Sequence, residues 1–200
     1  MAQKWSNQNL PGALHYITGN VWHRIPIFRQ ERCCLAFLNE CNDLLKRWPA
    51  KLITHVVMPD HFHLIANPRD GDIRGFSGAL KSLTARKIIE LTGGELFLRE
   101  EPDTDGSIHQ VWQESFKAFP LWSLWMIKQK INYIHANPVR AKLVASAKDY
   151  RWSGFRALYF DSKEPIPVDH DWWWPDDSEK LSKAMKSLGW RSYNKRNSKS

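Results

Sequence analysis

Two histidines separated by one residue, His61 and His63, have the types and spacing that most directly suggest chemistry. They lie in His61–Ala66, an apolar run typical of a β-strand. Side chains at i and i+2 of a strand leave the same face, and their Cα atoms stand about 7 Å apart. Phe62 and Leu64 then face the core on the other side. Two imidazoles on one face can converge on one divalent cation, so the spacing predicts a metal site.

A tyrosine and an asparagine further along the chain could complete this site. Tyr133 and Asn137 are four residues apart in a run with helical periodicity, so they lie on one helix face, one turn from each other. A phenol oxygen and an amide oxygen on a rigid helix could serve as a nucleophile and a third metal ligand for attack on phosphorus. The same spacing also fits an ordinary helix end, because asparagine before proline is a common helix stop.

Motifs around these residues resemble those of a known family. Four segments carry the resemblance, in the same order as in that family: Val56–Ile65, Val111–Phe116, Tyr133–Val144 and Asp149–Ser153. From about residue 14 to about residue 155 the chain is similar to the single-tyrosine HUH transposases, and within them to the REP-associated tyrosine transposases.

The resemblance implies a role for each candidate residue. It implies that His61 and His63 bind a divalent metal, Mg²⁺ or Mn²⁺, that Tyr133 is the nucleophile, and that Asn137 is the third ligand. It also implies a DNA substrate in which a repetitive palindrome folds as a hairpin beside a short single-stranded guide sequence. The product in this family is a 5′-phosphotyrosine with a free 3′-hydroxyl, and the reverse attack rejoins strands without ATP. His135 lies two residues beyond Tyr133, so helix geometry points its side chain away from the nucleophile.

Hydrophobic periodicity indicates the elements that would position these residues. Alternation and β-forming residues predict strands over residues 14–21, 51–58, 61–66 and 109–116. Helical spacing predicts helices over residues 32–47, 72–91, 121–137 and 178–188, the third of them stopped by Pro138. Glycine, proline and acidic residues predict a mobile acidic loop over residues 92–107.

The order of these elements predicts an α+β fold with a small antiparallel β-sheet and helices packed against it. The resemblance implies the same architecture, in its HUH-type, ferredoxin- or RRM-like form. From residue 161 the composition shifts to proline, aspartate and a run of tryptophans, followed by a basic tail. We therefore expect an HUH transposase domain over residues 1–160 and a C-terminal extension over residues 161–200.

The charge balance agrees with a DNA partner but does not require one. The chain has 29 Lys and Arg against 21 Asp and Glu, a net charge of +8 and a pI of about 9.5. This excess suits a polyanionic partner and a salt-sensitive affinity. The same residues also fit ordinary solvated positions. The candidate DNA contacts are Arg24, Arg29, Arg74, Lys81, Arg86, Arg140 and Lys142.

Other sequence features favour a cytoplasmic protein without a membrane partner. The chain has no run of 18 apolar residues and no charged-then-apolar leader. Its three cysteines, Cys33, Cys34 and Cys41, are odd in number and fall in a helical pattern. This pattern argues against a disulfide framework and favours reduced thiols.

Two other functions compete with a transposase, and the oligomeric state is open between monomer and homodimer. The first alternative is a domesticated DNA-binding protein that has lost cleavage. The second is a metal-dependent nuclease that uses water as the nucleophile, with Tyr133 merely structural. Substitution of Tyr133 by phenylalanine separates the second alternative from a transposase, because a water-using enzyme keeps its activity.

Overall fold

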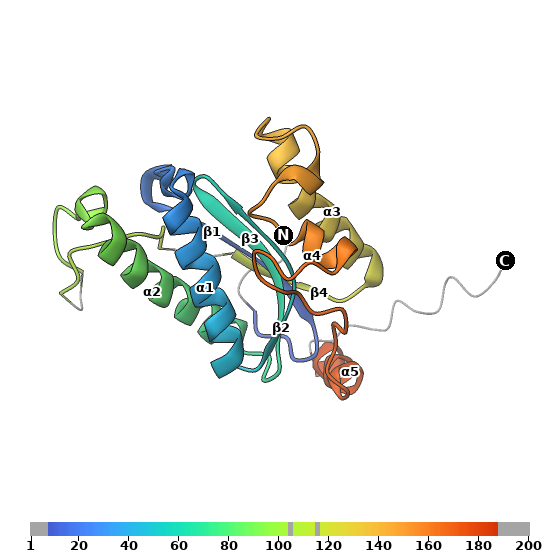
Figure 1. Ribbon diagram of the computed structural model, residues 1–200. Coiled ribbons are helices and arrows are strands. Elements are labelled where there is room, and N and C mark those ends of the chain that lie inside the picture. Colours follow the sequence, from blue (N-terminus) through green and yellow to red (C-terminus); the bar gives the residue numbers. More distant parts are fainter. Residues whose placement is uncertain (1–7, 104–105, 115–116, 188–200) are drawn as a thin grey trace, which may run out of the picture.

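A four-stranded antiparallel sheet forms the centre of the protein (Figure 1). The computed structural model describes residues 8–103, 106–114 and 117–187. The strands are β1 (Leu14–Asn20), β2 (Ala50–Met58), β3 (His61–Pro68) and β4 (Lys117–Leu121). Their order in the sheet is β2-β3-β1-β4. β2 and β3 form a hairpin, so β3 is held between two neighbours and is a rigid place for a functional side chain.

Helices cover both faces of this sheet (Figure 1). On one face, α1 (Glu31–Arg47) and α2 (Ile73–Thr92) bury Phe62 and Leu64 of β3. On the other face, α3 (Leu124–Arg140) packs against β2, and its apolar side chains join Ile65 of β3. Two shorter helices follow, α4 (Phe155–Phe160) and α5 (Asp177–Ser187). The predicted α+β fold is confirmed.

The predicted strand over residues 109–116 is wrong, because the fourth strand lies further along the chain at β4. In the segment before it, His109 and Trp112 form isolated bridges to Leu98 and Val21 and do not belong to a strand of the sheet. The Trp112 indole packs against Phe28, Phe37 and Phe62. β4 contains a proline and is the edge strand beside β1, a position where a missing N–H is tolerated.

The predicted end of the tyrosine helix at Pro138 is also wrong, because α3 continues to Arg140. Proline within a helix removes the N–H that would bond the carbonyl four residues earlier, here that of Ile134. The side chain of Asn137 offsets this loss: its Nδ2 lies 2.8 Å from the Tyr133 carbonyl oxygen and 3.5 Å from that of Ile134. The helix begins at Leu124 because the Ser123 hydroxyl caps it.

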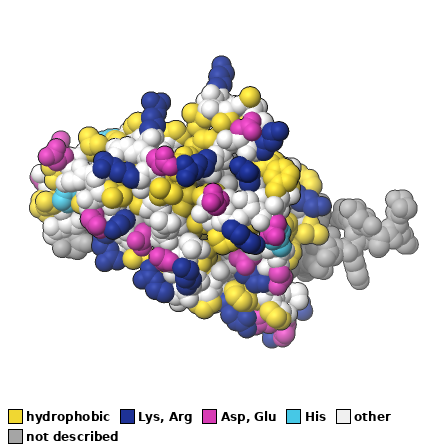
Figure 2. Space-filling model, viewed as in Figure 1, with side chains coloured by type: hydrophobic (Ala, Val, Ile, Leu, Met, Phe, Trp, Pro, Cys, Tyr) yellow, Lys and Arg dark blue, Asp and Glu magenta, His cyan; other side chains and the backbone are white. Residues whose placement is uncertain are grey.

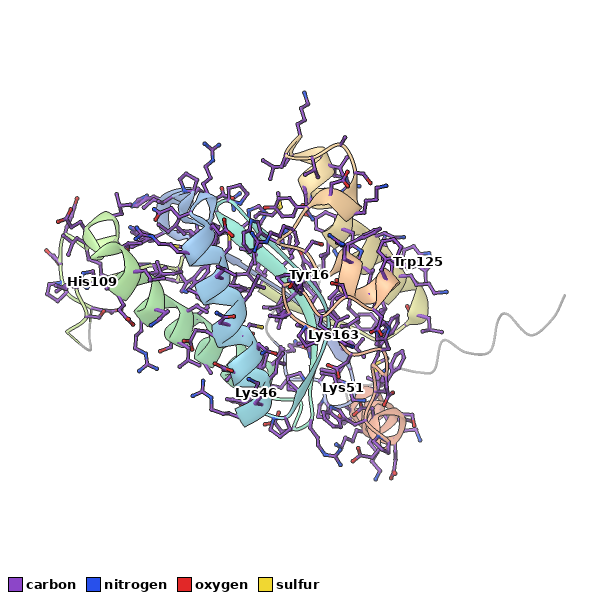
Figure 3. The ribbon with its side chains drawn as sticks, in the orientation of Figure 1. Tyr16, Lys46, Lys51, His109, Trp125 and Lys163 are labelled. Carbon is purple, nitrogen blue, oxygen red and sulfur yellow. The ribbon has the colours of Figure 1, made fainter. Side chains whose placement is uncertain are left out.

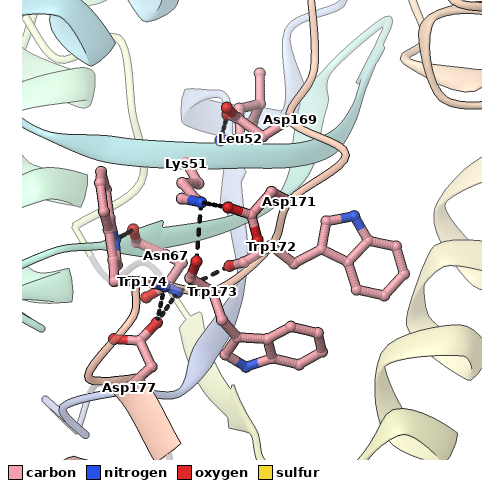
Figure 4. Close-up of polar contacts among 9 residues, drawn as sticks. All are labelled: Lys51, Leu52, Asn67, Asp169, Asp171, Trp172, Trp173, Trp174 and Asp177. Atoms are coloured by element: carbon pink, nitrogen blue, oxygen red, sulfur yellow. Dashed lines mark hydrogen bonds and ion pairs between the residues drawn. The ribbon is translucent and has the colours of Figure 1, made fainter.

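The segment after α4 covers the open edge of β2 (Figure 4). The Asp169 N–H donates to the Leu52 carbonyl at 2.7 Å, and its carboxylate accepts the Leu52 N–H at 2.7 Å. Next to this pair, Lys51 donates to the Asp171 carboxylate at 2.7 Å and to the Trp173 carbonyl at 2.9 Å. An edge strand otherwise leaves its N–H and C=O groups open to pairing with another chain, so this segment protects the sheet.

Helix α5 is tied to the end of β3 by a buried polar cluster (Figure 4). Asn67 donates to the Asp177 carboxylate at 2.6 Å and to the Trp172 carbonyl at 3.0 Å. In return, the Trp174 indole N–H donates to the Asn67 carbonyl at 3.1 Å. Gly12, at φ +78°, lies so close that a Cβ there would stand 2.2 Å from the Asp177 carbonyl oxygen. The predicted helix near residues 178–188 is confirmed as α5, and the basic tail lies outside the described residues.

The three cysteines, which the sequence predicts to be reduced thiols, lie in α1. Cys33, Cys34 and Cys41 are free and buried in α1, and burial raises the pKa of the Cys34 and Cys41 thiols to about 12. Such thiols are poor nucleophiles at neutral pH. Within the described part of the chain, no helix has both the length and the apolar character needed to cross a membrane.

Candidate active site

The histidine pair lies on the α3 face of the sheet. β3 pairs with β1 so that His61 is opposite Asn20 and His63 is opposite Thr18. The strand period predicts that residues at i and i+2 share one face of the sheet. The two rings do so, with centroids 4.8 Å apart. His63 is buried, while the His61 side chain keeps 15% of its surface exposed. A ligand could therefore approach the pair from the His61 side.

Each ring has an oxygen partner at Nδ1. His61 Nδ1 lies 2.5 Å from Oδ1 of Asp60, and His63 Nδ1 lies 2.8 Å from the Tyr16 hydroxyl. When Nδ1–H of a histidine donates to an oxygen, the lone pair is on Nε2, and metal-ligating histidines commonly have this arrangement. The Asp60 carboxylate can only accept, so His61 can offer Nε2 to a cation, and His63 can do the same when the Tyr16 hydroxyl accepts its Nδ1 proton.

The histidines are neutral at physiological pH, the form in which imidazole binds metal. Burial lowers the pKa of His61. Burial, with smaller contributions from the neighbouring His61, Lys130 and Arg24, lowers the pKa of His63 to about 3. Protons therefore do not compete for the ring nitrogens in the physiological range.

Tyr133 of α3 lies beside this pair. Its ring centroid is 5.7 Å from that of His63 and 6.3 Å from that of Tyr16. Two cations of the same helix face it: Lys130 Nζ lies 5.2 Å from the Tyr133 ring centroid, and the Arg140 guanidinium carbon lies 5.5 Å from it. Residues three and seven positions apart share one helix face, so α3 presents a phenol between two positive charges. These charges can stabilise a phosphate or a developing phenolate.

Tyr16 is a second tyrosine in the site, and the sequence analysis did not select it. Figure 3 shows it in the middle of the molecule, whereas Trp125 lies on the outer side of α3. Burial and the neighbouring Tyr133 raise the pKa of Tyr16, so its hydroxyl stays protonated. Lys130 Nζ lies 4.7 Å from its ring centroid. Tyr16 therefore suits a positioning role better than that of a nucleophile.

Asn137 lies one turn beyond Tyr133 on α3. Its Nδ2 donates to the Tyr133 carbonyl at 2.8 Å, which turns the amide oxygen away from the helix. An amide oxygen is the atom of this side chain that binds a hard cation. Within the described ranges, no three His, Cys, Asp or Glu side chains form a group that could hold a metal ion. A metal site here would combine two imidazoles with an amide oxygen, a mixed nitrogen and oxygen donor set that suits a transition-metal cation such as Mn²⁺ better than Mg²⁺.

The predicted DNA contacts divide between the two faces of the molecule. Arg24 and Arg140 lie at the candidate site, and the exposed Lys142 follows α3. Arg29 is exposed in the short 3₁₀ turn before α1. The remaining candidates, Arg74, Lys81 and Arg86, belong to α2 on the opposite face of the sheet. Figure 2 shows basic and acidic side chains interspersed over the face it views, so charge alone does not locate a DNA path there.

The Lys81 side chain makes a hydrogen bond within the protein. Its ammonium donates to the Gln113 carbonyl at 2.7 Å, and burial lowers its pKa to about 8. The Lys81 carbonyl in turn accepts the Trp112 indole N–H at 3.0 Å. These contacts hold the segment before β4 against α2.

Sequence reasoning missed Asp60, Tyr16 and Lys130. Lys130 could have been found, because it lies three residues before Tyr133 on the same helix face. Asp60 directly precedes His61, and a carboxylate beside a candidate metal ligand is a recognisable signal. Tyr16 depends on the register of β1 against β3, which no local pattern contains. His135 points away from Tyr133 as predicted, with Nε2 2.7 Å from the buried Thr54 hydroxyl.

Comparison with known proteins supports the fold. No protein-family model matches the chain, and no curated protein matches it significantly. Among solved structures, a REP-associated tyrosine transposase bound to a REP hairpin matches with a TM-score of 0.59 and 18% identity, covering 84% of this chain and 94% of that chain. The chain shares the fold of that transposase. The resemblance inferred from the motifs is confirmed at the level of the fold.

Two further solved structures match the chain with lower TM-scores. A Deinococcus radiodurans protein described as a transposase matches with a TM-score of 0.44 and 19% identity, covering 60% of this chain and 87% of that chain. The tRNA(His) guanylyltransferase from Saccharomyces cerevisiae matches with a TM-score of 0.45 and 13% identity, covering 93% of this chain and 81% of that chain. At such scores neither structure contributes to the functional argument.

Proposed function

We propose that this protein cleaves and rejoins single-stranded or hairpin DNA by metal-dependent transesterification, with Tyr133 as the nucleophile. One observation carries the proposal: the Tyr133 phenol lies beside the His61–His63 pair, with ring centroids of Tyr133 and His63 5.7 Å apart. Strand β3 and helix α3 bring these residues together from positions seventy residues apart in the chain. The shared fold with a REP-associated tyrosine transposase supports the same function.

The reaction exchanges one phosphoester bond for another. The Tyr133 oxygen attacks phosphorus and loses its proton, and the bond from phosphorus to the 3′ oxygen breaks. The leaving 3′ oxygen takes a proton to become a free hydroxyl, while the 5′ phosphate stays on Tyr133. Because no water enters, attack by a DNA 3′-hydroxyl on the phosphotyrosine reverses the exchange and joins strands. Lys130 and Arg140 would stabilise the negative charge that develops around the phenol.

The proposed metal ligands are His61, His63 and Asn137. A bound Mg²⁺ or Mn²⁺ would supply Lewis acidity toward a non-bridging oxygen of the scissile phosphate. Nδ1 partners orient the two rings, and the bond from Asn137 Nδ2 to the helix orients its amide oxygen. With these contacts, the three side chains would present oriented donor atoms to a cation before substrate arrives.

We propose hairpin DNA with a single-stranded flank as the substrate. A phosphate inside a regular duplex is hard to place between β3 and α3, whereas a flexible single strand can enter. The structural neighbour, which is described as bound to a REP hairpin, supports this choice. Arg24, Arg140 and Lys142 are the predicted DNA contacts that lie at or next to the site.

The decisive experiment looks for the covalent intermediate. Purified protein is incubated with Mn²⁺ and a 3′-labelled library of single-stranded DNA hairpins, then separated on a denaturing protein gel. We expect a labelled protein band that disappears in Tyr133→Phe and in the absence of divalent metal. Tyr159→Phe is the matched control, because Tyr159 is half exposed on α4 and packs against His135 without contact to the site.

Each alternative function predicts a different result in this experiment. Cleavage without a labelled band, persisting in Tyr133→Phe, would indicate a nuclease that uses water and would overturn the proposal. Tight hairpin binding without cleavage would indicate a DNA-binding protein that has lost the reaction. Sequencing the DNA recovered from a covalent band would identify the recognised site.

A further inference from the structure

The Pro59-Asp60 turn that joins β2 to β3 places a carboxylate directly beside the His61 ring. Asp60 uses both of its oxygens: Oδ1 lies 2.5 Å from His61 Nδ1, and Oδ2 lies 2.9 Å from Nε of Arg24. A carboxylate that accepts the Nδ1 proton fixes the tautomer in which Nε2 carries the lone pair. It also restricts rotation of the ring. Asp60 can therefore set both the chemical form and the direction of His61.

Arg24 is held in turn by a chain of amide groups. Its guanidinium donates from Nη1 to the Asn20 side-chain oxygen at 2.5 Å, and Asn20 Nδ2 donates to the Gln113 side-chain oxygen at 3.1 Å. Asn20 ends β1 and is opposite His61 in the sheet. Each of these contacts pairs a donor with an acceptor, so hydrogen bonds run without a break from Gln113 to His61. The Asp60 carboxylate is thus held by Arg24, which is supported in turn by Asn20 of β1 and Gln113 of the segment before β4.

The backbone that carries Arg24 adopts a conformation that side chains disfavour. His23 and Arg24 are consecutive and both left-handed, with φ of 48° and 59°. Strained non-glycine residues persist where the surroundings over-determine them, and they cluster at functional sites. Here the Val21 N–H donates to the Asp60 carbonyl at 2.9 Å and ties the loop to the turn. In this conformation the Arg24 side chain reaches back to the Asp60 carboxylate.

We propose that Asp60, held by Arg24, is a positioning residue that orients Nε2 of His61 toward a divalent cation. This inference rests on the proposed function, because that function makes His61 a metal ligand. It assigns the Arg24 guanidinium to a protein carboxylate, whereas the charge of Arg24 alone suggests a contact with DNA. The two roles differ in a measurable way, since positioning of His61 operates when no DNA is present.

The affinity of the protein for a divalent cation distinguishes a positioning role of Asp60 from a merely structural ion pair with Arg24. The Arg24 and Asp60 side chains are 48% and 23% exposed, and ion pairs at such positions contribute little to stability. A merely structural pair would therefore change neither folding nor metal binding by much. Loss of an outer partner of a metal-ligating histidine, by contrast, commonly weakens metal affinity 10- to 100-fold.

The test is calorimetric titration of the full chain with Mn²⁺ in the absence of DNA. We expect Asp60→Ala to weaken binding about 10-fold or more. Asp60→Asn should weaken it less, because an amide oxygen still accepts from Nδ1, and Arg24→Gln should act in the same direction. Glu90→Gln and Lys87→Gln are matched controls, since they break an exposed ion pair of 2.8 Å on α2. Urea unfolding of each variant identifies any loss that comes from misfolding.

The outcomes separate this inference from the proposed function. If the wild-type chain binds Mn²⁺ and His61→Ala abolishes binding, but Asp60→Ala and Arg24→Gln bind normally, the positioning role is overturned and the metal site stands. If Arg24→Gln weakens only hairpin binding, Arg24 is a DNA contact and the positioning role is again overturned. If the wild-type chain binds no Mn²⁺, the proposed function fails and the inference fails with it.

Discussion

At the scale of single residues, the site depends on oxygen atoms that hold the two histidines. Tyr16→Phe removes one hydroxyl and keeps the ring that Lys130 covers. We expect about 10-fold weaker Mn²⁺ binding, because His63 Nδ1 loses its partner. Stability should fall by about 1 kcal/mol, the usual value of one hydrogen bond. Titration with Mn²⁺ and urea unfolding measure the two effects.

Tyr150→Phe is the control for this substitution. The Tyr150 hydroxyl donates to the Val57 carbonyl at 2.8 Å and is partly buried, and this bond involves neither His61 nor His63. It should lose similar stability and keep its metal affinity. Equal metal affinities in Tyr16→Phe and the wild-type protein would show that the Tyr16 hydroxyl does not orient His63.

At the scale of elements, the last turn of α3 combines a structural and a chemical role in Asn137. Its nitrogen bonds the Tyr133 carbonyl and its oxygen is the proposed metal ligand. Asn137→Ala should therefore lose both about 1 kcal/mol of stability and Mn²⁺ affinity. Asn137→Asp should lose stability, since a carboxylate cannot donate and is unfavourable at a helix C-terminus, but it should retain metal binding. Urea unfolding and Mn²⁺ titration of both variants check this.

A result in which Asp and Ala at this position bind metal equally would remove Asn137 from the ligand set. Equal stability of both variants and the wild type would instead show that the bond to the Tyr133 carbonyl contributes nothing measurable. The two roles of Asn137 are therefore tested by independent measurements.

Local patterns predicted the first three strands and the helices α1, α2, α3 and α5, and failed at β4. The strand period placed His61 and His63 on one face and Phe62 on the other, and the structure has this arrangement. The location of β4 could not be read in the same way, because a short edge strand containing Pro120 has no distinguishing pattern. The contact between His63 and Tyr16 depends on strand register, which tertiary pairing sets.

At the scale of the whole molecule, buried neutral histidines make the fold sensitive to acid. Burial lowers the pKa of His15 to about 4 and that of His55 to about 3, from an ordinary value of 6.5. As pH falls below 6.5 the unfolded chain binds protons that the native protein does not, so stability decreases until the native pKa is reached. The expected loss is about 1.4 kcal/mol per pH unit for each histidine.

Urea unfolding between pH 7.5 and pH 4.5 measures this dependence. His15→Gln removes one titrating group, so the slope of unfolding free energy against pH should fall by about 1.4 kcal/mol per unit. His170→Gln is the control, because it makes the same substitution at an exposed histidine outside the core. An unchanged slope in His15→Gln would show that His15 binds protons equally in the native and unfolded proteins.

The whole molecule also determines whether one chain suffices for the reaction. In this fold α3 packs against the sheet of its own chain, and Tyr133 lies beside His63 of that chain. We therefore expect the protein to act through a site made by a single chain. An exchange of α3 between two chains would instead pair Tyr133 of one with His63 of the other. Mixing Tyr133→Phe with His63→Ala distinguishes these arrangements, because only exchanged helices rebuild an intact site. We expect no covalent adduct from the mixture, and an adduct would establish a dimer that shares α3.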